Sequence, residues 1–556
     1  MKHKIYLIVI LFFIPTIISF AQCKGCKYFV HPDSVAIVSI EGDLMPNLLP
    51  GDTICLNPGK YFQLYIHKIK GSAEKPIIIK NYNGEVIIEN NSNFGITFSD
   101  CAYIKFTGSG KSDLYYGFKI TNVQQGSGLS INYLSSDIEV ERVEISNIAF
   151  SGIVVKTDPD CSFTSLRDKF TLYNTFIHDN YIHDTGNEGM YIGSSFYRGY
   201  TLHCNGIDTT VLPHILSGVK IYNNRIERTG WDAIQVGSAS ANCKIYNNYV
   251  SNDSYAGYPD QMSGILIGGG SKCDCYNNII VNGKGDGIEV LGLGDFKIFN
   301  NLIINAGRSY YPNNPPTEHP KHGIFCKDIV TTQGKGYGFF NNTIVNPKTH
   351  GILFKNAVSS GNKMYNNIVV NPGALAFKVN SAYIKLDVPN GMVDTSHNFF
   401  SPSSYSFCFD DTLTNNYDLQ IASPLINKGL NITNEGVTFD LLNRQRPFGT
   451  AFDAGAYECW KNGAGTLEQI GNGIVKMFPN PASDYLFVSY TITTTIPIRI
   501  YIVDTFGKVV REITHKKPLN GSYQDVFSLR NLPCGTYFLV LSTSKEIISR
   551  KTIVKN

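Results

Sequence analysis

The chain has 556 residues, with 48 Lys and Arg against 45 Asp and Glu, so its formal net charge is only +3. This balance, without a basic block, excludes a surface built to clamp a polyanion, and we expect no nucleic-acid partner. The 51 glycines, 33 tyrosines and 33 phenylalanines, without sustained helical periodicity, predict a turn-rich β protein too long for one ordinary compact domain.

The first residues, MKHKIYLIVILFFIPTIISFAQ, predict a secretory signal peptide. A Lys-bearing start, an apolar run and small residues before the expected cleavage site place this signal at residues 1–21. A lipidated Cys23 is the alternative, although FAQC has no small residue directly before the cysteine. No other stretch is long and apolar enough to span a bilayer, so we expect an exported protein without a transmembrane segment after signal removal.

A repeat fills the middle of the chain. Its rule is an aromatic residue, Asn-Asn, two apolar residues spaced by two, a turn, then Gly-apolar-x-apolar, as in DCYNNIIVNGKGDGIEVLG (274–292). Each unit predicts about three short strands. Stacked units would bury a continuous Ile and Val interior, with the second Asn of each pair in a hydrogen-bonded ladder. The pattern therefore predicts a β-solenoid. The aromatic positions, 23 to 41 residues apart, are Tyr222, Tyr246, Tyr276, Phe299, Phe340 and Tyr365.

This repeat resembles the right-handed parallel β-helix superfamily of pectate-lyase type, and the resemblance implies the handedness. LLPGDTICLNPGKYFQLYIHKIKGSAEKPIIIKNYNGEVIIEN (48–90) resembles the opening rungs of secreted β-helix proteins, including the family with alginate lyases and chondroitinase B. The stretch SPLINKG…RQRPFGTAFDAGAYE (423–458) resembles their closing segment. The predicted fold class is all-β, a right-handed parallel β-helix over residues 22–460 followed by a small C-terminal β-sandwich.

The pattern changes after Glu458. Residues 461–472 form a Gly-rich linker, and residues 473–556 predict a β-sandwich of about seven strands. The motifs FPNPASD and LPCGTYFLVL resemble the C-terminal sorting domain of the type IX secretion system. That resemblance implies the secretion machinery as a partner and release to the medium or the outer cell surface.

Polar residues gather where the third strand of each repeat begins. Because equivalent positions of stacked rungs lie about 4.8 Å apart, we expect them to form one exposed row. The residues directly before the Gly of the motif are Ser151, Glu188, Asp232, Ser263, Asp286, His322 and His350. The residues two after it are Val154, Tyr191, Gln235, Leu266, Glu289, Phe325 and Leu353, and a further column carries Lys156, Lys327 and Lys355.

Three inserts, 194–218, 252–263 and 307–322, flank this face and are rich in Tyr. Long loops are often functional, and aromatic rings beside polar groups suit sugars, so we expect them to wall a groove for a polysaccharide. The candidate substrate-binding residues are Tyr191, Arg198, Gln235, Tyr310 and Tyr311.

Two mechanisms fit such a groove. Glycoside hydrolysis uses an acid and a second carboxylate. Such a pair would lie about 5 Å apart on adjacent rungs and about 9–10 Å apart on rungs two apart. β-Elimination uses a base and a cation beside the uronate, with Asp232, Asp286 and Glu289 as Ca²⁺ ligands. The candidate catalytic residues are Glu188, Asp232, Asp286, His322 and Lys327.

A lyase is favoured slightly over a hydrolase, and a uronan C5-epimerase and a non-catalytic adhesion module stay open. The motif series of the polygalacturonases and of the alginate-lyase family are missing, so no functional residue is carried over from either. Structural roles compete for the same residues, since Asp before Gly is common in turns, and for His322 and His350 the capping of a turn is favoured over catalysis.

Cysteine usage agrees with an exported protein. There are 13 cysteines, so complete pairing within the chain is impossible. Cys243 and Cys273 occupy equivalent positions and are candidates for a disulfide between neighbouring rungs, and Cys161 and Cys204 for one that staples a loop. Buried thiols are the alternative. We expect a monomer.

Overall fold

The computed structural model describes residues 25–308, 319–373, 380–460 and, apart from short gaps, 473–555. The predicted signal peptide, Cys23 and the linker lie outside these residues, as do Tyr310 and Tyr311. The described residues are almost entirely β-strands and turns, without an α-helix. They include four short 3-10 helices: η1 (Gly42–Leu44), η2 (Ser404–Phe407), η3 (Thr412–Thr414) and η4 (Thr433–Glu435).

Three long parallel sheets form the solenoid, and we name them by the order of their strands within one rung. The first sheet contains β1 (Tyr28–Val30), β3 (Thr53–Leu56), β6 (Ile77–Asn81), β9 (Ala102–Thr107), β12 (Ser136–Glu141), β16 (Phe176–His178), β22 (Lys220–Tyr222), β26 (Cys243–Tyr246), β29 (Cys273–Tyr276), β32 (Phe296–Phe299), β35 (Tyr337–Phe340), β38 (Asn362–Tyr365) and β41 (Val393–Ser396). The second contains β4 (Gly59–Tyr61), β7 (Val86–Glu89), β10 (Phe118–Thr121), β13 (Val143–Ile148), β17 (Tyr181–Thr185), β23 (Arg225–Thr229), β27 (Tyr249–Ser251), β30 (Ile279–Val281), β33 (Leu302–Ile304), β36 (Thr343–Val345), β39 (Ile368–Val370) and β42 (Phe399–Ser401). The third contains β2 (Ile37–Glu41), β5 (Gln63–His67), β8 (Phe94–Ser99), β11 (Ser127–Asn132), β14 (Ile153–Val155), β18 (Met190–Ile192), β24 (Ile234–Val236), β28 (Ser263–Ile267), β31 (Asp286–Val290), β34 (Ile324–Lys327), β37 (Ile352–Lys355) and β40 (Ile384–Leu386).

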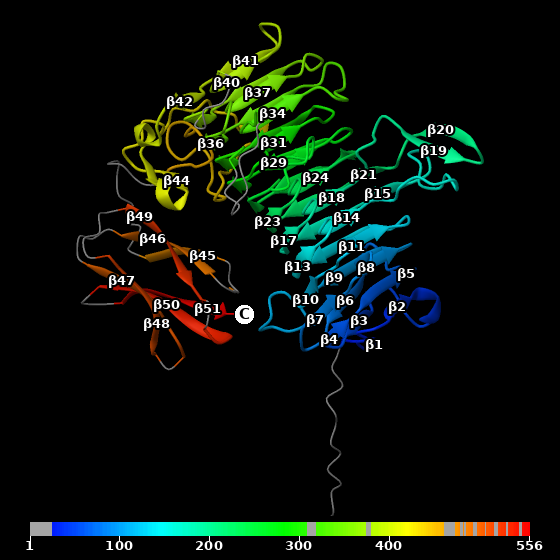
Figure 1. Ribbon diagram of the computed structural model, residues 1–556. Helices are drawn as coiled ribbons and strands as arrows, with labels where there is room; N and C mark the ends of the chain where they lie inside the picture. Colours follow the sequence, from blue (N-terminus) through cyan, green and yellow to red (C-terminus); the bar gives the residue numbers. More distant parts are fainter. Residues whose placement is uncertain are drawn as a thin grey trace, which may run out of the picture.

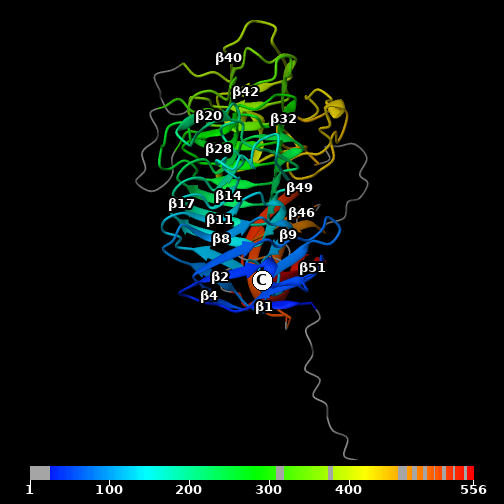
Figure 2. The same ribbon diagram turned by 90° about the vertical axis from the view of Figure 1, so that its right-hand side faces the viewer.

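The predicted solenoid is confirmed, and its rungs stack along one axis (Figures 1 and 2). Every strand of the three sheets pairs in parallel with the equivalent strand of the next rung, as β22 does with β26, where Tyr222 faces Tyr246. The ladder begins at Tyr28, so the solenoid starts well before the opening-rung motif at residue 48. Inward side chains such as Ile221, Ile226 and Ile234 are fully buried and form one continuous core.

The Asn-Asn pairs have two different functions. The first Asn turns the chain in the left-handed region, as Asn223 does with φ of 55°, a conformation that Asn tolerates better than most residues. The second Asn forms the predicted ladder: Asn224 Nδ2 donates to Asn248 Oδ1 at 3.0 Å and to Ile177 O at 2.9 Å. The same contacts repeat through Asn180, Asn224, Asn248, Asn278, Asn301, Asn342, Asn367 and Asn398.

The aromatic residues before these pairs stack on the outer face of the first sheet. Tyr222 and Tyr246 lie 4.9 Å apart with an interplanar angle of 4°, and Tyr246 and Tyr276 lie 5.0 Å apart. His178, one rung earlier, lies on the end of this stack, 4.4 Å from Tyr222. Because the strands are parallel and in register, each ring lies over the equivalent ring of the next rung, which explains why an aromatic residue recurs once in each repeat.

Smaller elements decorate the solenoid. They are the three-stranded sheet β15 (Thr171–Tyr173), β21 (Ile215–Ser217) and β25 (Ala239–Ala241), the hairpin β19 (Tyr200–Cys204) and β20 (Ile207–Val211), and the pair β43 (Phe409–Asp411) and β44 (Asn416–Leu419). The hairpin projects from the side of the solenoid (Figure 1). The two predicted disulfides, Cys161–Cys204 and Cys243–Cys273, are present, together with Cys26–Cys55, which was not predicted.

The C-terminal segment forms the predicted seven-stranded sandwich. Two antiparallel sheets enclose a separate core that includes Leu486, Ile500 and Leu539. Its strands are β45 (Gly473–Phe478), β46 (Tyr485–Ile492), β47 (Ile498–Val503), β48 (Val509–His515), β49 (Gly521–Ser528), β50 (Gly535–Thr543) and β51 (Ile547–Lys555).

Candidate functional site

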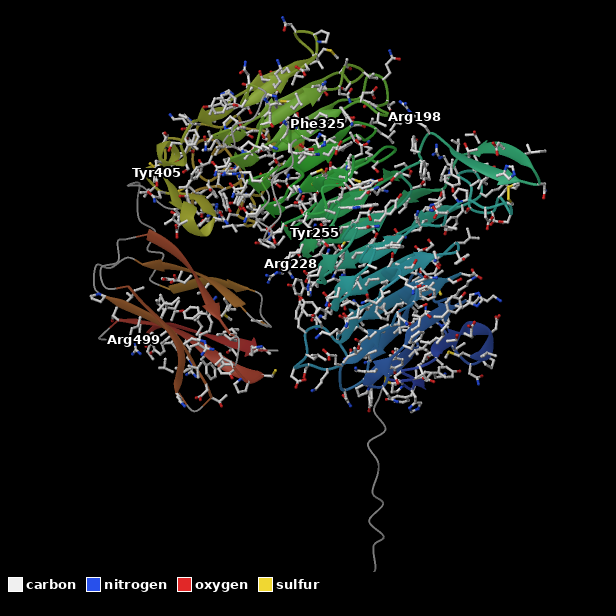
Figure 3. The ribbon with its side chains drawn as sticks, viewed as in Figure 1. Arg198, Arg228, Tyr255, Phe325, Tyr405 and Arg499 are labelled. Atoms are coloured by element: carbon white, nitrogen blue, oxygen red, sulfur yellow. A yellow bond between two sulfur atoms is a disulfide. The ribbon has the colours of Figure 1, made fainter. Side chains whose placement is uncertain are left out.

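The predicted column of acids and histidines exists on the third sheet. Strand register places Ser263 opposite Asp286 directly, and pairs Met190 of β18 with Ile234 of β24, which brings Glu188 and Asp232 to the same position of adjacent rungs. The neighbouring column is also as predicted, since Tyr191 pairs with Gln235 and Leu266 with Glu289. Figure 3 marks Phe325 of β34, the next residue of that column.

The glycine after each acid explains why these side chains lie outside the core. A Cβ on Gly287 would meet Ile303 Cγ2 and Gly323 O, each at 2.5 Å, so only glycine fits where the chain approaches the interior. The preceding Asp286 instead lies against Lys321.

The expectation of an exposed row is wrong. Asp232 is 0% exposed, and Glu188 and Asp286 are each 2% exposed. The sequence spacing determines which column a residue belongs to. The segments that precede the strands of the third sheet determine whether its side chain is covered. Two cavities of about 310 Å³ each are lined by other residues, including Leu166 and Arg167 for one and Ile384 and Phe400 for the other.

Asp286 is held by a lysine of the 307–322 insert that was not among the predicted site residues. Lys321 Nζ lies 2.8 Å from Asp286 Oδ2 and donates to Met262 O at 3.0 Å, and the backbone N–H of His322 donates to Asp286 Oδ1 at 2.6 Å. Burial disfavours the charge of Lys321, but Asp286, Glu289 and Asp232 outweigh it and raise the pKa of the ammonium group. Lys327, a predicted catalytic residue, makes a longer contact with the acids, with its Nζ 3.8 Å from Glu289 Oε1.

Serines of the same column bind two further acids. Ser151 Oγ donates to Glu188 Oε2 at 2.7 Å, and Ser263 Oγ donates to Glu289 Oε2 at 3.0 Å. Burial raises the pKa of Glu188, and burial together with Asp286 raises that of Glu289. Each of these carboxyl groups therefore holds a proton more readily than in water.

Asp232 differs from its neighbours because, within the part of the chain that the structure describes, neither of its carboxyl oxygens has a hydrogen-bond partner. Burial, and then the charges of Glu289 and Glu188, hold its pKa well above the usual range for Asp. Two more buried oxygens nearby lack partners among the described residues: Gln235 Oε1 on β24, the strand that follows Asp232, and Oδ2 of Asp253, whose pKa burial raises to about 6. Each such group costs about 1–3 kcal/mol, so this polar cluster is not explained by stability.

The two histidines of the column cap successive turns, as their structural interpretation predicted. His322 Nδ1 accepts from the backbone N–H of His350 at 3.3 Å, and His350 Nδ1 accepts from that of Ala382 at 3.0 Å. The rings are stacked 5.1 Å apart. Burial lowers the pKa of His322 to about 4, so its imidazole is neutral at pH 7.

The other predicted substrate-binding residues divide into two groups. Tyr191 and Gln235 both contact Ser195, the tyrosine hydroxyl at 3.0 Å and the amide nitrogen at 2.7 Å, so they lie together beside the acids. Arg198 is exposed in the segment that leads to the β19–β20 hairpin (Figure 3).

Sequence reasoning missed an aromatic pair next to Asp232. Trp231 and Tyr258 are stacked 4.7 Å apart, and Tyr258 is 54% exposed. Phe150, two rungs earlier in the column of Trp231, is 51% exposed. Trp231 directly precedes the candidate acid, and this adjacency was the available signal.

The predicted calcium ligands do not converge. Within the described chain, the ligand atoms of Asp232, Asp286 and Glu289 do not form a group of three that all lie within 4.8 Å of one another. The Lys321 ammonium group is already bound to Asp286.

Two parts of the chain match known family models. Residues 214–388 match the right handed beta helix region, and residues 476–555 match the secretion system C-terminal sorting domain. The chain is therefore a right-handed parallel β-helix protein with a type IX sorting domain, and it is exported to the cell surface or the extracellular space. Among the described residues, no helix has both the length and the apolar character needed to cross a membrane.

Solved structures give distant similarities. Pectate lyase Pel9A has a TM-score of 0.43 at 14% identity, covering 78% of this chain and 97% of that one. GH136 lacto-N-biosidase from Eubacterium ramulus has a TM-score of 0.37 at 12% identity, covering 67% and 68%. The A-module of Azotobacter vinelandii mannuronan C-5 epimerase AlgE6 has a TM-score of 0.31 at 14% identity, covering 64% and 91%. A comparison with the curated proteins found no match.

Proposed function

We propose that this exported β-helix protein cleaves a polysaccharide by glycoside hydrolysis at the acid column of the third sheet. Asp232 is the proposed general acid, and Glu188 and Asp286 are the candidates for the second carboxylate. The observation that carries the proposal is the fully buried Asp232 carboxyl group, which lies among other acids and has no hydrogen-bond partner among the described residues.

The environments of the acids support this division of roles. A glycosidase needs one carboxyl group that keeps its proton and another that is ionised. Burial and the charges of Glu289 and Glu188 raise the pKa of Asp232 and so favour its neutral form. Asp286, unlike Asp232, accepts hydrogen bonds from the Lys321 ammonium group at 2.8 Å and from the backbone N–H of His322 at 2.6 Å.

Hydrolysis is favoured over elimination because the two lysines and the histidine nearest the acids already contact other groups. An elimination site must neutralise a uronate and supply a base. Lys321 is paired with Asp286, Lys327 lies near Glu289, and the Nδ1 atom of the neutral His322 accepts a backbone hydrogen bond. The buried side chains around Asp232 are mainly acids, which suits a neutral sugar better than an anionic one.

The stacked pair Trp231 and Tyr258 supports a sugar ligand. Aromatic rings beside polar groups suit a sugar ring, which has an apolar face and a hydroxyl rim. This pair is partly exposed, and its Trp231 directly precedes Asp232 in the chain, which suits a role in guiding a sugar toward the acid.

A product assay tests the proposal. The full-length protein is incubated with neutral and uronic-acid polysaccharides, and new reducing ends and unsaturated, ultraviolet-absorbing ends are measured. We expect reducing ends without unsaturation, lost in Asp232→Asn and kept in Asp295→Asn, which changes an exposed turn carboxylate paired with Lys272. Unsaturated ends would contradict hydrolysis, and full activity of Asp232→Asn would contradict the assigned acid.

Glycan binding without cleavage is the second candidate. The observation that favours it is the burial of the acids, combined with the exposure of the Trp231–Tyr258 pair. It predicts saturable binding of a polysaccharide without products, and equal affinity of the wild type and Asp232→Asn.

A further inference from the structure

A second polar cluster lies on the outer face of the first sheet, away from the acid column of the third sheet. Glu139 and Glu141 extend from β12, and His178 extends from β16 in the next rung. Their register pairs Glu141 with His178 across the two strands. One ligand atom of each residue lies within 4.8 Å of the other two, and among the described residues this is the only such group of His, Cys, Asp or Glu.

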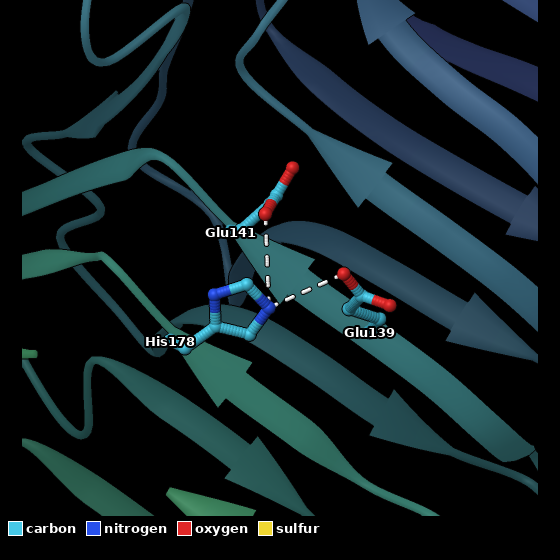
Figure 4. Close-up of side chains that lie close together, drawn as sticks. All are labelled: Glu139, Glu141 and His178. Atoms are coloured by element: carbon cyan, nitrogen blue, oxygen red, sulfur yellow. Dashed lines mark hydrogen bonds and ion pairs between the residues drawn. The ribbon is translucent and has the colours of Figure 1, made fainter. Parts of the chain in front are cut away.

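The imidazole of His178 lies between the two carboxylates (Figure 4). Its Nε2 atom is 3.2 Å from Glu139 Oε1 and 3.7 Å from Glu141 Oε2. The side chains of His178 and Glu141 are 8% and 13% exposed and that of Glu139 is 28% exposed, so the cluster is partly desolvated and more open at Glu139. One imidazole nitrogen and two carboxylate oxygens form a ligand set that suits Zn²⁺ and related transition-metal ions.

Groups behind the imidazole fix its orientation. Asp179 Oδ2 lies 2.7 Å from His178 Nδ1, and the Tyr115 hydroxyl donates to the other oxygen of Asp179 at 3.3 Å. Tyr222 stacks on the ring at 4.4 Å. A carboxylate on the second nitrogen is the usual partner of a metal-binding histidine, because it sets the tautomer and makes the free nitrogen a better ligand.

Positive charge already occupies this place. Lys105 Nζ, from the preceding rung, lies 2.5 Å from Glu139 and 3.1 Å from Glu141. A divalent ion at this place would supply the positive charge that Lys105 now supplies, so it can replace the ammonium group without leaving the two carboxylates uncompensated.

We propose that Glu139, Glu141 and His178 form a binding site for a divalent transition-metal ion that links two successive rungs of the solenoid. The site has three protein ligands and leaves the remaining positions to water or to a further ligand. It is independent of the proposed hydrolysis, because it is on another sheet. The imidazole ligand excludes a preference for Ca²⁺, which takes oxygen ligands.

Metal titration of the full-length protein tests the site, with Zn²⁺ as the probe and Ca²⁺ as the comparison. We expect wild type to bind one Zn²⁺ per chain and His178→Gln to lose it. His183→Gln is the matched control. Like His178, His183 has the carboxylate of the next residue at its Nδ1 atom, here Asp184 at 2.6 Å. Among the described residues, however, its Nε2 atom has one carboxylate within ion-pair distance, that of Glu144 at 3.6 Å, rather than two. Lys105→Met is expected to bind Zn²⁺ about tenfold more tightly, because it removes the competing ammonium group.

Several results would overturn the proposal. These are no Zn²⁺ binding by either wild type or Lys105→Met, or binding that is unchanged in a folded His178→Gln variant. Zn²⁺ binding that disappears with Cys534→Ser, an exposed thiol, would also overturn it. If His178→Gln does not fold, Glu141→Gln and Lys105→Met still give opposite expected changes in affinity. Co²⁺ bound at this site is expected to show no thiolate charge-transfer band.

Discussion

Two buried polar columns run along the same solenoid, and they obey different rules. In the asparagine ladder each side chain donates to the rung before it and to the next Asn, as Asn278 does to Ile245 O and to Asn301 Oδ1, both at 3.0 Å. In the acid column Asp232 has no partner for either oxygen among the described residues. Both columns recur at a fixed position of the repeat, although the first is always Asn and the second varies among Ser, Glu, Asp and His, so recurrence alone does not separate architecture from a candidate site.

Hydrogen-bond satisfaction separates them. A buried amide with all its partners stabilises the stack, whereas an unpartnered carboxyl group costs free energy and persists only if something other than stability requires it. The comparison predicts that the two columns respond in opposite ways to isosteric substitution.

The largest expected effect is on activity. Asp232→Asn removes the proposed proton donor and should lower the rate of polysaccharide cleavage about 10²–10⁴-fold. The free energy of unfolding at pH 7 should stay equal or rise, because the amide needs no proton to be neutral. Parallel product assays and denaturant unfolding measure both, and a strongly destabilised variant would place Asp232 among the structural residues.

The ladder should show the reverse. Asn278→Asp replaces a donor amide with a carboxylate that faces the carbonyl of Ile245 and the oxygen of Asn301, and should lower the free energy of unfolding by about 3 kcal/mol. Any activity of the folded fraction should be unchanged. Urea titration gives the first quantity, and a loss of less than about 0.5 kcal/mol would contradict the ladder's contribution.

pH should test the buried acids around Asp232, which include Asp253 although it belongs to neither column. Burial raises the pKa of Asp253 to about 6, so the folded chain binds this proton more tightly than the unfolded chain does. The contribution is present below about pH 4 and is lost as the pH rises through about 6. Relative to wild type, Asp253→Asn should therefore gain about 2 kcal/mol of stability between pH 4 and pH 7. Unfolding curves at several pH values measure this, and a difference that does not vary with pH would refute it.

The smallest effect concerns the aromatic pair. Trp231→Ala removes the stacking partner of Tyr258 and should weaken polysaccharide binding by about 1 kcal/mol, roughly fivefold, while Phe29→Ala, an exposed aromatic on the first rung, should not. Isothermal titration with the substrate identified by the assay measures the difference. Equal losses in both variants would argue against a specific sugar contact.

The comparison also shows where sequence reasoning stopped. The columns were predicted residue by residue because Gly-apolar-x-apolar recurs, and in-register stacking converts recurrence into adjacency. Lys321 was not assigned to the site because it lies outside that motif and reaches Asp286 from a turn. The cluster of Glu139, Glu141 and His178 was missed because these earlier rungs lack the Asn-Asn pair by which the repeat was recognised.

The sequence by itself determined the solenoid, its register, the asparagine ladder and the sorting domain, because each depends on a local pattern repeated at fixed positions. Only the tertiary structure decided that the acid row is buried, which lysine binds it and which oxygens stay unpaired. Those properties depend on side chains from turns far apart in the chain, whose paths no repeat specifies.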